Sequence, residues 1–302
     1  MALSVYALTS LADCKTYMRI TSADDDALIT ELINAATRYI EVLTSRRLAA
    51  REHKQWVDGR NSRRLVLDNY PILEVNRVAY GRASAIDATY TGTGIRASIQ
   101  VTSAAVITRS WSTTGVLTST SSTFATNAST SALVTALDAI SGWDGTLRTN
   151  VPADDLCPLA GQPALNVTVG LYYPPLDQNV NIIDAAAGIL ELDRSPGWSQ
   201  AWEGRSLPVG YGSFYPRGFL EVLVEYRAGF ESISSAVETS DLAQVCREIV
   251  AEAWQRRGLN TNVASESLGD YSYSLVRQMD LAADRAARLR PWTTPPVGRR
   301  AA

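Results

Sequence analysis

The chain has 302 residues, of which 46% are hydrophobic and 20% are charged, and its formal net charge is −3. This is globular composition, which excludes a disordered chain, and it lacks the broad basic excess of a dedicated nucleic-acid-binding protein. The three cysteines lie far apart without a C-x-x-C pair, so neither a disulfide framework nor a zinc site is predicted. The first ten residues do not resemble a secretory signal, and no apolar run approaches the ~18 residues of a membrane span.

Two helices are predicted near the N-terminus. Thr9 or Ser10 can cap a short helix, and a longer helix follows with Ser22 as a candidate for a capping box, three aspartates in its first turn and an arginine pair in its last. Apolar residues recur along the longer helix every three to four positions, at Leu28, Leu32, Ala35, Tyr39 and Leu43, flanked by Ile29, Ile33, Ala36 and Ile40. Because this stripe is wide, we expect the helix to pack on two sides.

Strand-like segments follow at 53–57, 65–67 and 75–80, and Pro71 is expected to separate two strands. Composition then changes near Arg82, and 102–135 is rich in Ser and Thr, which is typical of short strands joined by polar turns. A helix at 131–140, a strand at 165–173 and Gly- and Pro-rich loops at 174–218 complete this part. We predict that 83–215 is an inserted, mainly β subdomain.

The last third begins with an alternating strand at 219–227. A second long helix is predicted at 240–258, where Gly258 suits a left-handed cap, and a final helix at 275–290 should end before Pro291. The predicted class is therefore α+β. Residues 1–82 and 216–302 would form a discontinuous core, a small helical bundle with a short β element, and 83–215 would interrupt it.

Few residues suit catalysis or metal binding. The single histidine, His53, lies in a strand-like stretch and cannot build a multi-histidine metal site. Asp154 and Asp155 leave one enzyme hypothesis open, a glycan hydrolase with paired carboxylates. Aromatic side chains could instead bind a sugar or another protein, although packing is the commoner reason for such a group: Trp111, Trp143, Trp198, Trp202, Tyr211, Phe214 and Tyr215. We predict no catalytic residue, no cofactor and no metal.

Two stretches together resemble a known family. The first, 11–80, contains ADDDALITELINAATRYIEVLTSRRL and WVDGRNSRRLVLDNYPILEVNRVAYG. The second, 216–274, contains PRGFLEVLVEYRAGF, DLAQVCREIVAEAWQRRG and SESLGDYSYS. Their order resembles the head–tail connector proteins of tailed bacteriophages, also called adaptor or head completion proteins. The resemblance covers about half of the chain, and 83–215 departs from it.

The resemblance implies a virion protein of the head–tail junction, assembled in the bacterial host cytoplasm. Its subunits would form a homo-oligomeric ring, commonly a dodecamer, that binds the portal above and a downstream neck or tail protein below. The ring would join head to tail and continue the DNA channel, with genomic DNA passing through without sequence-specific binding. The family brings no catalytic residues and no membrane association.

A basic and aromatic C-terminal segment supplies the candidates for the portal interface: Tyr271, Tyr273, Arg277, Arg285, Arg288, Arg290 and Trp292. The ordinary alternative for these residues is a solvated helix face followed by a disordered end. A different function also stays open for the chain, in which the β insert makes it a carbohydrate-binding, surface-binding or decoration protein of the virion.

Overall fold

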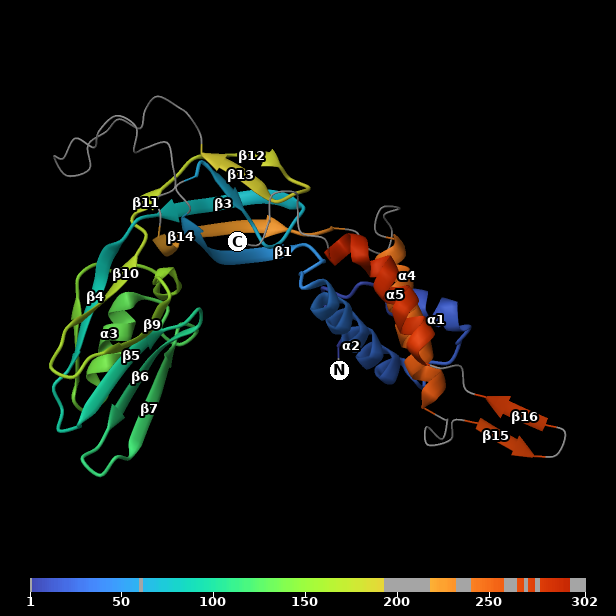
Figure 1. The fold of residues 1–302 in the computed structure, drawn as a ribbon, viewed down its shortest axis with the longest axis horizontal. Helices are drawn as coiled ribbons and strands as arrows, with labels where there is room; N and C mark the ends of the chain where they lie inside the picture. The colour runs from blue at the N-terminus through green and yellow to red at the C-terminus, as the bar shows by residue number, and fades with distance from the viewer. Residues whose placement is uncertain are drawn as a thin grey trace.

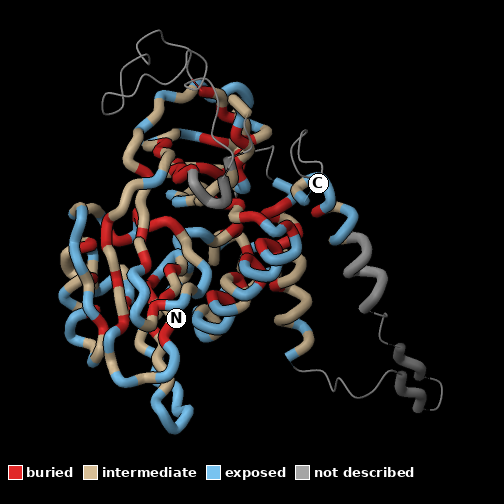
Figure 2. The backbone as a smooth tube through the Cα atoms, turned by 60° about the vertical axis from the view of Figure 1, so that its left-hand side comes forward, coloured by how far each residue is buried: buried red, intermediate tan, exposed pale blue. Residues whose placement is uncertain are grey.

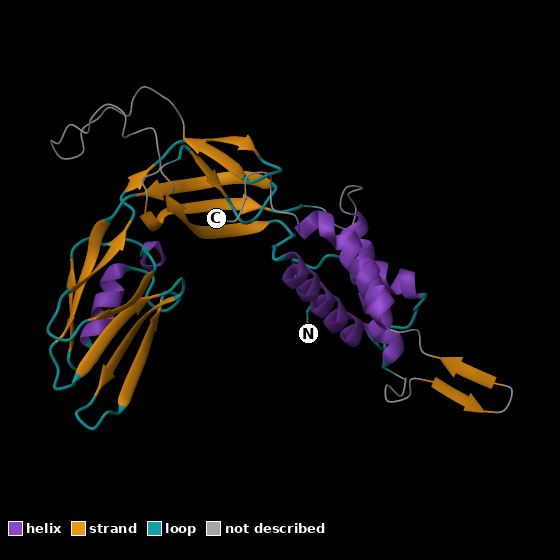
Figure 3. Ribbon diagram, viewed as in Figure 1, coloured by secondary structure: helices purple, strands orange, loops and turns teal. Residues whose placement is uncertain are grey.

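The computed structural model describes residues 2–59, 62–192, 218–231, 240–257, 265–268, 271–274 and 278–293. These residues form three units in a row, with a central β unit between a helical unit and an insert unit (Figure 1). Each unit has its own cluster of buried apolar side chains. The α+β class predicted from the sequence is confirmed. Apart from one α-helix and a short 3-10 turn in the insert unit, the helices gather at one end of the molecule (Figure 3).

The helical unit consists of four helices around one buried cluster: α1 (Leu11–Met18), α2 (Asp26–Thr44), α4 (Ser240–Arg256) and α5 (Gln278–Thr293). As predicted, Ser10 caps α1, since its hydroxyl accepts a hydrogen bond from the amide of Asp13 at 3.0 Å. The prediction that Pro291 would end the last helix was wrong, because α5 continues through this proline to Thr293. Gly258, the predicted cap of the second long helix, lies outside the described residues.

The longer N-terminal helix, α2, differs from its prediction at both ends. The expected capping box does not form, because the hydroxyl of Ser22 is hydrogen-bonded to Asp24 and the helix begins only at Asp26. The helix ends at Thr44, since Ser45 adopts the left-handed conformation (φ 53°) and closes the last turn. The arginine pair expected in the last turn therefore lies beyond the helix.

The central β unit contains two antiparallel sheets. One has the strand order β1-β14-β3-β11 and the other has the order β12-β13-β2. The strands are β1 (Arg51–Gly59), β2 (Arg64–Val66), β3 (Ile72–Tyr80), β11 (Leu176–Asp177), β12 (Val180–Asp184), β13 (Ile189–Leu192) and β14 (Gly218–Ala228). Pro71 separates β2 from β3, as predicted. Val78, Val224 and Tyr226 lie in the apolar cluster between the two sheets.

Three of these strands correct the expectation of loops at 174–218. β11 pairs with β3 and β13 pairs with β2, in both cases with a partner that lies far away in the sequence. Such short strands have little local signal, because their stability comes from partners that are remote in the chain. The later part of this segment, 193–217, lies outside the described residues.

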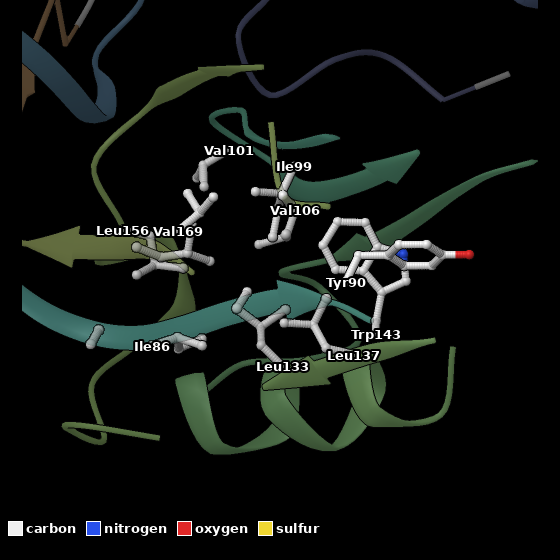
Figure 4. Close-up of a cluster of buried hydrophobic side chains, with 14 of the residues drawn as sticks. Ile86, Tyr90, Ile99, Val101, Val106, Leu133, Leu137, Trp143, Leu156 and Val169 are labelled. Carbon is white, nitrogen blue, oxygen red and sulfur yellow. The ribbon is translucent and has the colours of Figure 1, made fainter. Parts of the chain in front are cut away.

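The insert unit packs two sheets and a helix around the largest aliphatic and aromatic cluster (Figure 4). One sheet has the order β10-β4-β8 and the other has the order β7-β6-β5-β9. The elements are β4 (Ala83–Tyr90), β5 (Arg96–Val101), β6 (Ala105–Trp111), β7 (Leu117–Thr123), α3 (Thr130–Asp138), β8 (Trp143–Leu147), the 3-10 turn η1 (Ala153–Asp155), β9 (Leu159–Pro163) and β10 (Val169–Tyr173). Leu133 and Leu137 point from α3 toward the strands. The short Ser- and Thr-rich strands predicted in this part are confirmed.

Candidate assembly interface

The outward side of α2 is an apolar surface that the described part of the chain leaves uncovered. Leu28 is 38% exposed, Tyr39 is 49% exposed and Val42 is 61% exposed, whereas Ile33 and Ile40 on the opposite side are fully buried. We call the exposed apolar residues of this side the α2 stripe: Leu28, Ala35, Tyr39, Val42 and Leu43. Leu32 lies between them but is half-buried against the helical cluster. The flanking isoleucines thus pack inside the helical unit, and the outward apolar residues have no cover among the described residues. The packing of α2 on a second side therefore stays a prediction.

Three of the portal-interface candidates are tied to the chain's own helical unit. Arg285 of α5 forms an ion pair with Glu252 of α4 at 2.5 Å, and Arg288 forms one with Glu248 at 2.9 Å. The ring of Trp292 packs edge-on against the ring of Phe230 at 5.4 Å between centroids, and its carbonyl oxygen accepts a hydrogen bond from Arg46 at 3.0 Å. The inner face of α5 is therefore held by contacts within the chain.

The other candidates are less closely defined. Tyr271 and Tyr273 lie on β16 (Tyr271–Ser274), which pairs with β15 (Ser265–Leu268), but the described residues do not include their side chains. Arg277 lies outside the described residues altogether, and Arg290 is on the exposed side of α5. A portal-binding role for these residues stays a prediction.

The two acids of the enzyme hypothesis lie in an ion cluster between the insert unit and the central β unit. The carboxylate of Asp155 in η1 accepts hydrogen bonds from Lys54 of β1 at 2.6 Å and from Arg77 of β3 at 2.8 Å. The side chain of Asp155 is 4% exposed. Lys54 also pairs with Asp154 and with Glu225 of β14, both at 2.9 Å. Asp155 is thus held by two cations and joins the two units, while the more exposed Asp154 adds a second ion pair to Lys54.

The pKa values of the two basic groups follow from this arrangement. Burial by itself would lower the pKa of Lys54, but hydrogen bonds to Asp155, Asp154 and Glu225 outweigh burial and raise the pKa to about 12. The same competition between burial and carboxylate partners raises the pKa of Arg77. Sequence reasoning missed this cluster, because Lys54 and its partner Asp155 are 101 positions apart and neither position has a local signal.

His53 and Trp143 are packing residues, as their ordinary interpretations predicted. His53 stacks on Tyr226 at 5.3 Å between ring centroids, and burial, with a smaller effect of the charge of Arg51, lowers its pKa. Trp143 is 5% exposed and packs against Tyr90 at the end of the insert cluster (Figure 4). Among the residues with described side chains, no group of three His, Cys, Asp or Glu could hold a metal ion.

Residues 7–114 match the family model described as head completion protein. The resemblance seen in the sequence is confirmed. The match to head completion proteins spans α1, α2 and β1 to β3, and extends into the insert unit as far as β6. The match supports a structural role in the head–tail region of a phage particle.

Other comparisons add less to this assignment. No curated protein matches the chain. One solved structure, "Neck of empty GTA particle computed with C6 symmetry", contains a similar chain with 14% sequence identity and a TM-score of 0.40. That alignment covers 100% of this chain and 97% of the other. In the part of the chain that the structure describes, no helix is long and apolar enough to span a membrane.

Proposed function

We propose that this chain is a ring subunit of the head–tail junction, placed below the portal, and that its ring continues the DNA channel from head to tail. The family match at 7–114 supports the place in the particle, and the α2 stripe supports assembly into a ring. The ring, commonly a dodecamer in the family, would form in the host cytoplasm and remain in the virion, with a downstream neck or tail protein on its far side.

The α2 stripe is the single observation that carries the proposal of assembly. A closed ring needs two different surfaces on each subunit, so that one surface of a subunit fits the other surface of its neighbour. The α2 stripe offers one of these two surfaces. Contiguous exposed apolar residues on a folded unit mark protein-binding surfaces more often than isolated ones do. The connector core is proposed at 1–82 and 216–302, with 83–215 inserted between its two parts. Within 83–215, only β4 to β10 form the insert unit, because β11, β12 and β13 pair with the strands of the central β unit.

A channel that lets DNA slide should not hold it. Phosphate contacts by Lys and Arg supply most of the non-specific affinity of proteins for DNA. The formal net charge of −3 fits a lumen that genomic DNA passes without sequence-specific binding.

Docking to the portal is proposed for the C-terminal segment. Deletion of 275–302 is a poor test, because Leu289 is 2% exposed in the helical cluster and Trp292 packs beside it, so the deletion would also damage the fold. Replacing Tyr271 and Tyr273 of β16 together with serine avoids this problem. We expect the double variant to lose portal binding in a pull-down assay while its circular dichroism spectrum stays unchanged. If portal binding is retained, β16 is not part of the interface.

The ring itself is tested by charges placed on the α2 stripe. Tyr39→Lys and Val42→Lys each put an uncompensated charge in the proposed contact, whereas Glu31→Lys adds the same side chain to an exposed site of α2 outside the stripe. Burying an unpaired charge costs about 3 kcal/mol or more, so subunit association should weaken by about a hundredfold or more.

The measurement is the mass of the assembly formed with purified portal, by mass photometry. Wild type and Glu31→Lys should form a multi-subunit ring on the portal, and the two stripe variants should not at the same concentration. Rings of normal mass from both stripe variants would show that α2 is not the subunit contact.

A further inference from the structure

We propose that the open side of β7 is a strand-pairing surface through which two copies of this chain associate about a two-fold axis. β7 (Leu117–Thr123) is the end strand of its sheet and, among the described strands, pairs with β6 alone; it forms an outer margin of the insert unit (Figure 1). We call its unpaired side the β7 edge. Most of the residues of this strand are exposed. Figure 2 shows how burial is distributed along the whole backbone.

The β7 edge lacks the protection that other end strands of this protein have. All seven residues of β7 pair with β6 in one uninterrupted register, and none of them is charged or proline. In contrast, β9 ends in Pro163 and its register with β5 is shifted, while β12 carries Asp184 beside a register shift. Charges, prolines and bulges are the usual means by which proteins prevent edge-to-edge pairing. β7 is therefore open to another strand.

The free backbone groups of the β7 edge follow from the hydrogen bonds at its two ends. The amide of Ser112 donates to the carbonyl of Val116, and the amide of Phe124 donates to the carbonyl of Ala104, both at 2.9 Å. In an antiparallel pair every second residue bonds the neighbouring strand, so these bonds set the phase along β7.

The amides and carbonyls of Leu117, Ser119 and Ser121 consequently point away from β6. No hydrogen bond among the described residues uses them. The next outward carbonyl, that of Thr123, is already occupied by the amide of Asn127 at 3.0 Å. The free segment is therefore bounded, with Leu117 at one end and Ser121 at the other.

A second copy of β7 fits this segment in one antiparallel register. With Ser119 opposite Ser119 of the second copy, Leu117 lies opposite Ser121 of that copy, and each free amide meets a free carbonyl. Since the segment has no charge, identical strands meet without repulsion. The contact would also cover Leu117, which is 48% exposed, and the adjacent Val116, which is 62% exposed. This self-complementarity argues for a second copy as the occupant.

Such a contact is independent of the proposed ring. A two-fold interface uses the same surface on both subunits and is saturated by two copies, whereas a ring needs two different surfaces on each subunit. It lies on the insert unit, while the α2 stripe belongs to the helical unit. Failure of either proposal therefore leaves the other standing.

Disulfide trapping tests the register in the full-length chain. In the proposed pairing the Cα atoms of residue 119 in the two copies lie about 5.5 Å apart, within the range that a disulfide spans. Ser119→Cys should form a covalent dimer on mild oxidation, while Ser121→Cys, which is also exposed and lies on the same strand face, should not. The native thiols of Cys14, Cys157 and Cys246 are buried and leave the background low.

Sedimentation velocity supplies the second measurement. We expect the wild-type chain to dimerise as its concentration rises, and Ser119→Lys to dimerise at least tenfold more weakly because two like charges would then meet at the axis. Ser119→Thr, which keeps the strand neutral, should behave as wild type. A wild-type chain that stays monomeric would overturn the proposal, as would equal cross-linking of Ser119→Cys and Ser121→Cys. If the β7 edge pairs with a strand of a different protein, the wild-type chain alone would stay monomeric.

Discussion

Replacing Asp155 with asparagine tests the contact between the insert unit and the central β unit, because Asp155 forms ion pairs with Lys54 and Arg77 of that unit. The substitution keeps the size of the side chain but removes its charge, and it can turn an amide N–H toward Lys54 or Arg77. Asp154 is the matched control, because it is adjacent, carries the same group and also pairs with Lys54. The two acids differ in burial, since the side chain of Asp155 is 4% exposed and that of Asp154 is 51% exposed.

The size of the effect follows from burial and from the partners that remain. Removing one member of a buried ion pair costs about 3–5 kcal/mol when the other charge is left alone. Here Lys54 keeps Asp154 and Glu225, and Arg77 keeps Asp177 at 2.7 Å, so the lower end applies. We expect Asp155→Asn to lower the free energy of unfolding by about 3 kcal/mol. Asp154→Asn should lower it by about 1 kcal/mol or less, as for an exposed pair.

Urea unfolding followed by tryptophan fluorescence measures both changes, and hydrogen exchange locates them. Exchange should rise first where η1 meets β1 and β3, because that contact loses its central anion. Equal losses for the two variants, or a loss below about 1 kcal/mol for Asp155→Asn, would refute the assignment of Asp155 as the buried joint of the two units. Reduced glycan cleavage with unchanged stability would instead favour the enzyme hypothesis.

Three further outcomes are expected. Gly229→Ala should destabilise the chain by about 2 kcal/mol or more, because Gly229 has φ +115° and an added Cβ would lie 2.7 Å from the carbonyl carbon of Ala49. Leu289→Ala should cost about 2–4 kcal/mol and loosen α5, since Leu289 is 2% exposed in the helical cluster. Because burial lowers the pKa of His53, the unfolded chain binds a proton more readily, so stability should fall as the pH drops below about 6.5, and His53→Gln should flatten this fall.

Controls exist for each of these outcomes. Gly161→Ala tests the general cost of the same change, since an added Cβ there meets nothing within 4 Å, and it should be close to neutral. Leu289→Met nearly conserves volume and should cost less than about 1.5 kcal/mol. Urea unfolding at a series of pH values checks His53, and a slope between pH 7.5 and 5.5 that is identical in His53→Gln would contradict its role.

Local patterns were sufficient to predict most of the helices and several strands. The cap at Ser10, the long amphipathic helix and the break at Pro71 each depend on neighbours within a few residues, so the order of side chains is enough to predict them. β11 and β13 were missed because they pair with strands that lie far away in the chain.

For the assembly surfaces too, part was predictable from the sequence and part was decided only by the tertiary structure. The width of the apolar stripe on α2 was visible in the sequence, and so was the resemblance to head completion proteins that the family match confirmed. Only the tertiary structure decided that Ile33 and Ile40 face inward while Tyr39 and Val42 face outward. Only the tertiary structure brought Asp155 to Lys54 and Arg77, and placed β7 at the end of its sheet. The reason is physical: helical periodicity is written in adjacent residues, whereas ion pairs and open edges depend on which remote segments meet.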